Sequence, residues 1–89
     1  MLEIKTSLDW QNVEREIQKL GNTLTMFKHD INTILKGVRE EVTILSKLEV
    51  EHRSTRSRQL EQQCRAQAAR INETLKLFQK YHLMALLAQ

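Results

Sequence analysis

The side chains that could carry chemistry in this sequence are three histidines and one cysteine. His29, His52 and His82 are dispersed, and none has a second metal-binding residue at a spacing typical of a zinc site. Cys64 has no adjacent base to generate a thiolate, and the neighbouring Arg65 would face another side of a helix. A single cysteine cannot form an intramolecular disulfide, so we expect a small buried thiol, with a disulfide between two copies as the alternative. The two glycines lie too far apart to form a phosphate-binding loop. We therefore expect no enzymatic activity, no metal site and no cofactor.

Arg53, Arg56 and Arg58 form the strongest electrostatic feature of the sequence. The planar guanidinium group is well suited to binding phosphate and carboxylate groups, so these residues are candidates for contact with an anion or a nucleic acid. No aromatic residues are interleaved with them, and no helix-turn-helix spacing is present. Binding to nucleic acid should then be weak, salt-sensitive and independent of base sequence. The alternative is a solvated turn that improves solubility.

The charge is distributed unevenly along the chain. Residues 1–52 contain seven Lys or Arg and nine Asp or Glu, a balance of −2. Residues 53–89 contain seven Lys or Arg and two Glu, a balance of +5. Two halves of opposite sign would attract each other when folded together, and the basic half would also suit an acidic partner.

The composition indicates an all-α fold that positions these residues on helices. The chain of 89 residues contains no proline, only two glycines and 40% hydrophobic residues. Residues that favour helices dominate, and the turn clusters of an all-β fold are missing. This length predicts one domain, close to the size at which a lone core is marginal.

A heptad-like seam of apolar residues dominates the first half of the chain. Its members follow one another at steps of three and four: Trp10, Val13, Ile17, Leu20, Leu24, Phe27, Ile31, Ile34, Val38, Val42 and Leu45. A seam of this length must lie against another helix. A phase shift beyond Ile31 broadens the apolar face, as in a three- or four-helix bundle.

The sequence predicts a long antiparallel, coiled-coil-like helical hairpin. Thr6 or Ser7 can cap the start of a first helix. The seam passes through both glycines, so this helix should run over about 7–53. The polar run after Val50 predicts a turn at about 54–57 with Ser57 as the next N-cap. A second helix then spans about 58–87. One unbroken helix is the alternative.

The two arms of this hairpin would differ in length. Pairing them about the turn leaves the first four seam residues without a partner in the chain: Trp10, Val13, Ile17 and Leu20. The end of the second helix is apolar on nearly every side, which adds Leu83, Met84 and Leu87 to the predicted interface. A dimer of hairpins forming a four-helix bundle would satisfy both ends.

These features predict a non-enzymatic helical interaction protein, such as an adaptor, chaperone or scaffold subunit. Its expected partners are a second copy or another helical protein. The alternative is a nucleic-acid-associated accessory factor, and a third hypothesis places Leu83–Leu87 on a membrane surface. No secretory signal or membrane-spanning run is visible, so we expect a cytoplasmic location.

Overall fold

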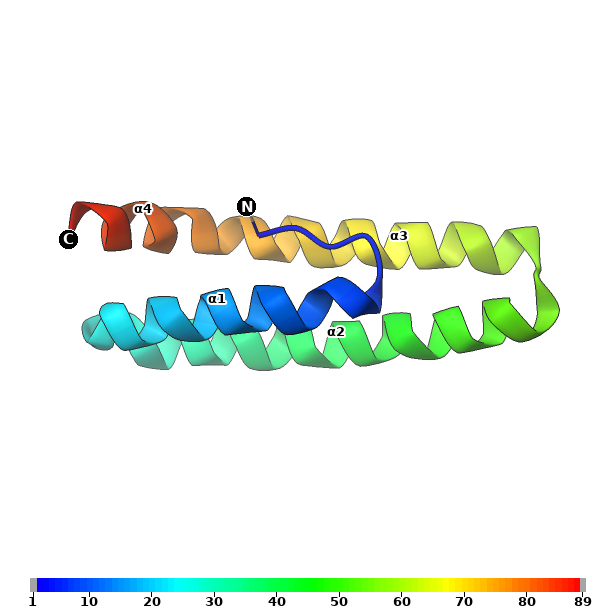
Figure 1. The fold of residues 1–89 in the computed structure, drawn as a ribbon, viewed down its shortest axis with the longest axis horizontal. Coiled ribbons are helices and arrows are strands. Elements are labelled where there is room, and N and C mark those ends of the chain that lie inside the picture. Colours follow the sequence, from blue (N-terminus) through cyan, green and yellow to red (C-terminus); the bar gives the residue numbers. More distant parts are fainter. Residues whose placement is uncertain (1, 89) are drawn as a thin grey trace.

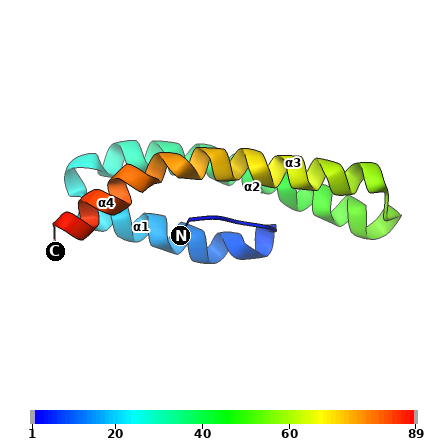
Figure 2. The same ribbon diagram turned by 90° about the horizontal axis from the view of Figure 1, so that it is seen from above.

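Helices account for almost all of residues 2–88, which a computed structural model describes (Figure 1). In chain order the α-helices of this range are α1 (Trp10–Thr23), α2 (Lys28–Thr55), α3 (Arg58–Leu75) and α4 (Gln79–Leu87). Short 3-10 turns precede or join them: η1 (Ser7–Asp9), η2 (Thr25–Phe27) and η3 (Lys76–Phe78). α1 runs antiparallel to α2, and α3 continues through η3 into α4 as a second rod antiparallel to α2 (Figures 1 and 2). The fold is therefore all-α, with three helical rods along part of a bundle 47 Å long.

The prediction of one helix over residues 7–53 is wrong, because the chain reverses at Leu24. This residue leaves the helical region (φ −106°, ψ 68°), η2 follows, and α2 begins at Lys28. Glu14 and Arg39 form an ion pair with 3.1 Å between Oε1 and Nη2. In one continuous helix these two residues would lie about 37 Å apart. The apolar rhythm continues through the break because residues on both sides of it face the same core.

The reversal gives the beginning of the apolar seam a partner within the chain. Val13, Ile17 and Leu20 are buried, and Trp10 packs half-buried against the same core. The prediction that these four side chains lack an intramolecular partner is therefore wrong. Each fully buried side chain of this size contributes roughly 1.5–3 kcal/mol, so the reversal recovers stabilisation that a two-helix hairpin would lose. The later elements and the N-terminal segment supply the rest of the core: Ile4, Ile31, Leu35, Val38, Val42, Leu45, Ala68, Ile71, Leu75, Phe78, Tyr81 and Ala85.

The second reversal is a two-residue turn between α2 and α3. Arg56 adopts a left-handed conformation (φ 51°), and its N–H donates to the His52 carbonyl at 2.7 Å. Ser57 caps α3, since its Oγ accepts from the Leu60 N–H at 3.4 Å. The turn thus lies within the range 54–57 that the polar run indicates.

The segment ahead of η1 is extended and runs alongside α3 (Figure 1). The buried Ile4 donates its N–H to Asn72 Oδ1 and accepts from Asn72 Nδ2 at its carbonyl, both at 2.8 Å. One side chain thus satisfies a donor and an acceptor that would otherwise be buried without partners. Asp9 Oδ2 accepts from the N–H groups of Lys5 and Thr6 at 2.8 and 3.2 Å. These hydrogen bonds lower the pKa of the Asp9 carboxyl.

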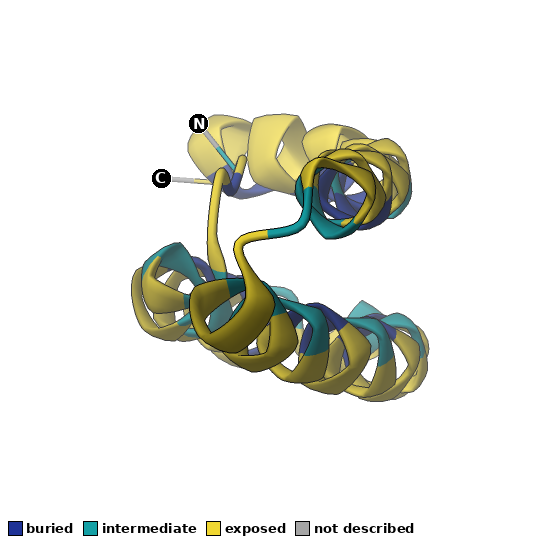
Figure 3. Cartoon of the chain, turned by 90° about the vertical axis from the view of Figure 1, so that its right-hand side faces the viewer, coloured by how far each residue is buried: buried dark blue, intermediate teal, exposed yellow. Residues whose placement is uncertain are grey.

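α1 does not cover the full length of α2 and α3. Its leading turn η1 meets α2 at Glu49, whose Oε2 accepts the Ser7 N–H at 3.0 Å. Beyond this point no third helix of the described range lies beside α2 and α3 up to the turn (Figures 1 and 2). We call residues 46–65, from the contact with η1 through the turn and into α3, the α2–α3 extension. Figure 3 looks onto it from the turn and shows mostly exposed ribbon.

Candidate functional site

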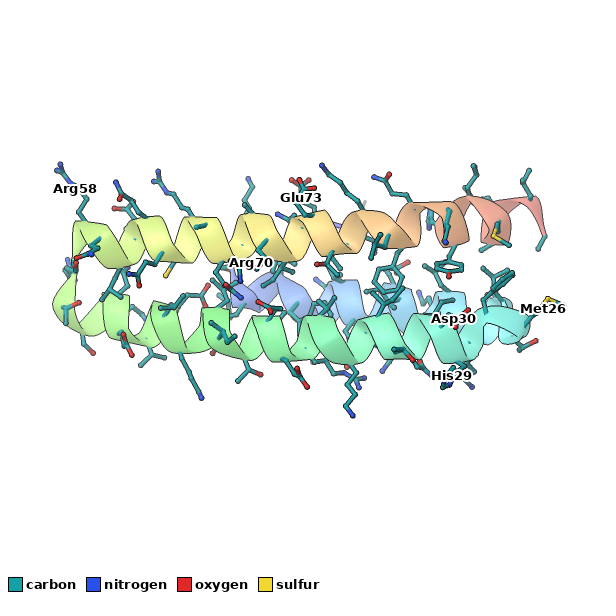
Figure 4. The ribbon with its side chains drawn as sticks, turned by 180° about the vertical axis from the view of Figure 1, so that it is seen from behind. Met26, His29, Asp30, Arg58, Arg70 and Glu73 are labelled. Carbon is teal, nitrogen blue, oxygen red and sulfur yellow. The ribbon has the colours of Figure 1, made fainter. Side chains whose placement is uncertain are left out.

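The first candidate surface lies at the end of the bundle formed by α4 and η2. It consists of five exposed large apolar side chains, which we call the C-terminal apolar end: Met26, Leu83, Met84, Leu86 and Leu87. Met26 is 88% exposed, Leu87 79% and Leu83 59%. Met26 and α4 lie at the same end of the molecule (Figures 1 and 4). Exposed apolar side chains gathered in this way are typical of interaction surfaces.

The geometry of α4 explains why its leucines face away from the core. Tyr81 and Ala85 are buried and lie four residues apart, on one side of the helix. Leu83 and Leu87 follow them by two residues each, which is a rotation of about 200°. The Phe27 and Tyr81 rings, with centroids 5.6 Å apart, hold α4 against η2. α4 is consequently apolar both on the side that touches the core and on the opposite side.

The residues predicted as one interface fall into two groups. Leu83, Met84 and Leu87 belong to the C-terminal apolar end. The four residues from α1 do not, because they pack on the core. The sequence-based prediction omitted Leu86, which belongs to the same apolar run, and Met26. Met26 lies off the apolar seam, and only the reversal at the end of α1 brings it to this surface.

The predicted arginine cluster lies at the opposite end of the bundle, around the turn between α2 and α3. Arg53, Arg56 and Arg58 are all exposed. The ion pairs formed within residues 2–88 involve none of the three. In Figure 4, Arg58 points outward from the start of α3. The turn thus concentrates three uncompensated positive charges at one tip of the molecule.

The second candidate surface is a groove on the α2–α3 extension. A cavity of about 560 Å³ opens there between α2, α3 and the segment that leads into η1. We call it the extension groove. Leu8, which is 88% exposed, and Cys64 supply its apolar part. The two helices supply its polar lining: Ser46, Glu49, His52, Arg53, Glu61 and Arg65.

The carboxylates of the extension groove already have partners. Glu49 accepts hydrogen bonds from both the N–H and the hydroxyl group of the first residue of η1. Glu61 Oε1 pairs with Arg65 Nη2 at 2.8 Å. Lys5 and Arg53 also line the groove but form no ion pair within the described part of the chain. The partners of Glu49 are neutral, so the lining combines three cations, Lys5, Arg53 and Arg65, with two carboxylates.

Cys64 is suited to packing and not to nucleophilic chemistry. Burial raises the pKa of its thiol, and the carboxylates of Glu49 and Glu61 raise it further. The sulfur consequently stays protonated at neutral pH. Its side chain is half-buried at the base of the groove, so it is less enclosed than the sequence indicated.

Residues 2–88 contain no arrangement suited to other kinds of chemistry. No three or more His, Cys, Asp or Glu side chains in this range gather in the way that metal binding requires. His29 and His82 are exposed on separate helices. No helix of the described range is both long and apolar enough to cross a membrane. Comparisons with protein-family models, with curated proteins and with solved structures found no match to this chain.

Proposed function

We propose that this protein is a small non-enzymatic helical interaction protein, an adaptor, chaperone or scaffold subunit that acts through helix–helix packing. The C-terminal apolar end is the observation that carries this proposal. Leu83, Leu86 and Leu87 all face solvent from one short helix, where each loses the stabilisation that burial would give. Covering them with another helix recovers roughly 1.5–3 kcal/mol for each side chain that becomes fully buried.

The first partner of this surface is a second copy of the chain. In a symmetric pair, the same apolar patch on each copy covers the other. α4 contains no acidic side chain and a single lysine, Lys80, so such a contact buries little charge. The four-helix bundle expected from the sequence required the apolar stripe of α1, most of which packs in the core. A smaller contact through α4 takes its place in this proposal.

Sedimentation velocity over a concentration series tests the proposed pairing. Association itself costs about 4–15 kcal/mol, so a contact of this size should give a dissociation constant in the micromolar range, on the order of 1–100 µM. The double variant Leu83→Gln and Leu87→Gln should stay monomeric throughout the series. Its matched control, Ile44→Gln with Val50→Gln, removes two half-exposed apolar side chains from α2 and should pair like the parent chain.

Two outcomes contradict the pairing. One is a chain that stays monomeric at every concentration, and the other is a control variant that dissociates as readily as the Leu83 and Leu87 variant. Flotation with lipid vesicles separates the membrane hypothesis from this one. If the chain stays monomeric and floats with the vesicles, and if this flotation depends on Leu83 and Leu87, the partner of the surface is a lipid membrane and not a protein.

A second candidate function, a nucleic-acid-associated accessory factor, is favoured by the three uncompensated arginines at the turn. Guanidinium groups there would contact phosphates without reading bases. Binding of a DNA duplex measured against salt concentration tests this candidate. Absence of binding even at about 50 mM salt contradicts it, and reversing the charges of Arg53, Arg56 and Arg58 should abolish any binding while leaving self-association intact.

A further inference from the structure

We propose that the groove between α1 and the rod of α3 and α4 binds an extended segment of a partner protein that carries aliphatic residues at alternate positions. Residues 2–5, which we call the strap, occupy part of this groove within the same chain (Figures 1 and 2). The inference goes beyond the proposed self-association, because it concerns a different class of partner. The docked strap is the pattern for how that partner would lie.

Asn72 binds the backbone of the strap and not a side chain. Its Oδ1 accepts from the Ile4 N–H and its Nδ2 donates to the Ile4 carbonyl oxygen, both at 2.8 Å. Two residues that pair across antiparallel strands exchange the same two hydrogen bonds. The amide of Asn72 thus takes the place of one residue of a neighbouring strand. Any extended residue that has a backbone N–H can pair with it.

The side chains of the strap alternate between the core and solvent. Ile4 is buried, and Leu2 packs half-buried against the core. Glu3 and Lys5 are exposed. This alternation is expected where an extended chain lies with one side against a hydrophobic core. The groove therefore accepts aliphatic side chains two residues apart and places no demand on the residue between them.

The groove continues beyond Leu2 toward α4. A cavity of about 450 Å³ lies there, lined by Leu2, Glu16, Gln79, His82 and Leu83. The two leucines give this cavity an apolar wall. Two residues of extended chain span about 7 Å. A peptide whose side chains replace those of Ile4 and Leu2 would therefore bring a third aliphatic side chain, two residues further on, to this cavity.

The strap is held by few contacts. Ile4 is its one buried side chain, and its hydrogen bonds to α3 involve a single residue, Asn72. Ordering the backbone of the strap costs conformational entropy, which offsets much of this gain. Asp9 accepts from the N–H groups of Lys5 and Thr6, so residues 2–4 can leave the groove without unfolding the turn into η1. An external peptide can then take their place.

Other occupants fit the groove less well. In the interior of a helix the backbone N–H and carbonyl groups are already paired, so a docked helix offers Asn72 nothing to bind. A nucleic acid has no backbone N–H groups. The strap of a second copy makes only the contacts that the chain's own strap makes and must also meet the cost of association. An extended peptide with one more aliphatic residue gains a contact that none of these has.

The test uses the full chain and two short synthetic peptides. The first has the sequence of residues 2–6 preceded by leucine and threonine, so that aliphatic residues stand at three alternate positions. The second is identical except that its isoleucine is N-methylated, which removes the N–H group that would donate to Asn72. Binding is measured by fluorescence anisotropy. In the ¹⁵N-labelled chain, NMR follows the backbone amide signal of Ile4, which reports whether the strap is docked.

The first peptide should bind and move the Ile4 amide signal to the position of a disordered residue. The N-methylated peptide should bind about tenfold more weakly or worse, because Asn72 Oδ1 is left without its donor. Ile4→Ser weakens the strap as a competitor, so the groove is open for a larger fraction of the time. This variant should therefore bind the first peptide more tightly, by on the order of tenfold.

Asn72→Ala is tested in the Ile4→Ser chain, because in the parent chain it would weaken the strap and the peptide alike. Added to Ile4→Ser, it should weaken peptide binding about tenfold through the loss of both hydrogen bonds. Asn32→Ala in the same chain is the matched control. Asn32 is an exposed asparagine of α2, and its replacement should change the affinity by less than about twofold.

Equal affinity for the two peptides would overturn the proposal, as would unchanged or weaker binding to a folded Ile4→Ser chain. Peptide binding that leaves the Ile4 amide signal in place would overturn it too. If circular dichroism shows that Ile4→Ser unfolds the chain, the comparison of the two peptides on the parent chain still decides. Leu87 does not line the groove, so Leu87→Gln should keep full peptide binding. This separates a failure of the groove from a failure of self-association through α4.

Discussion

Replacing Ile17 with alanine tests whether α1 belongs to the core of its own chain. The Ile17 side chain is 0% exposed, and its Cβ substituents fill space between α1 and the rest of the bundle. Truncating a buried isoleucine to alanine costs about 2–5 kcal/mol, because apolar contact is lost and a cavity remains. For a domain of this size, 1 kcal/mol corresponds to about 4–8 °C in Tm, so we expect a Tm lower by roughly 8–40 °C. Thermal and urea unfolding followed by circular dichroism measure this loss.

Two controls make the result interpretable. Ile17→Val removes one methylene and should cost about 0.5–1.5 kcal/mol, on the same scale but smaller. Leu83→Ala shortens an exposed side chain and should leave the unfolding of the monomer within about 0.5 kcal/mol of the parent. If Ile17→Ala kept the parent Tm as a monomer and instead dissociated an oligomer, the stripe of α1 would be an interface and the reasoning would be refuted.

Four further predictions concern single positions. Gly21→Ala should stabilise the fold by about 0.5–1 kcal/mol in urea unfolding, because its Cβ would meet Lys28 Cγ at an ordinary 3.7 Å and helix propensity improves. Arg56→Gly should raise the Tm by relieving about 1 kcal/mol of left-handed strain. Asn72→Ala should cost about 1–3 kcal/mol and expose the N-terminal segment to proteases, since it loses both hydrogen bonds to that segment. The folded-state pKa of Asp9 is lowered, so its stabilisation is present above the unfolded pKa and is lost as pH falls through the folded value. Asp9→Asn should therefore flatten the loss of urea-unfolding stability in acid, and an unchanged acid profile would contradict this.

The apolar seam predicted correctly that helices pack on helices, but not in which direction the chain runs. Spacings of three and four residues identify the buried face of each helix, and that face is the same whether the chain continues or folds back. Nothing near Leu24 resembles a strong stop signal, since proline is absent and Gly21 lies inside α1. The reversal is decided by tertiary burial of side chains such as Ile17, which no local pattern encodes.

The turn between α2 and α3 was easier to predict, because its signal is local. A run of polar residues cannot continue the seam, and Ser57 supplies the hydroxyl that caps the next helix. The exposed leucines of α4 could also be found, since a helix that is apolar on all sides has more apolar surface than one core can bury. The extension groove could not be found in this way. It exists only because α1 is shorter than α2 and α3 and leaves them uncovered near their turn. This arrangement depends on the reversal that the sequence did not predict.

The hydrogen bonds between Ile4 and Asn72 have a consequence for how the chain folds during its synthesis. They join positions 68 residues apart, whereas α2 and α3 pair across a turn of two residues. Closing a long loop costs more entropy than closing a short one, so the local α2–α3 pair should form before the N-terminal segment docks. On the ribosome, α1 emerges before α2 and meets it early, but the segment ahead of η1 has no partner until α3 has emerged. This segment is thus made before α1 but docks after it, and the apolar stripe of α1 stays partly uncovered until then.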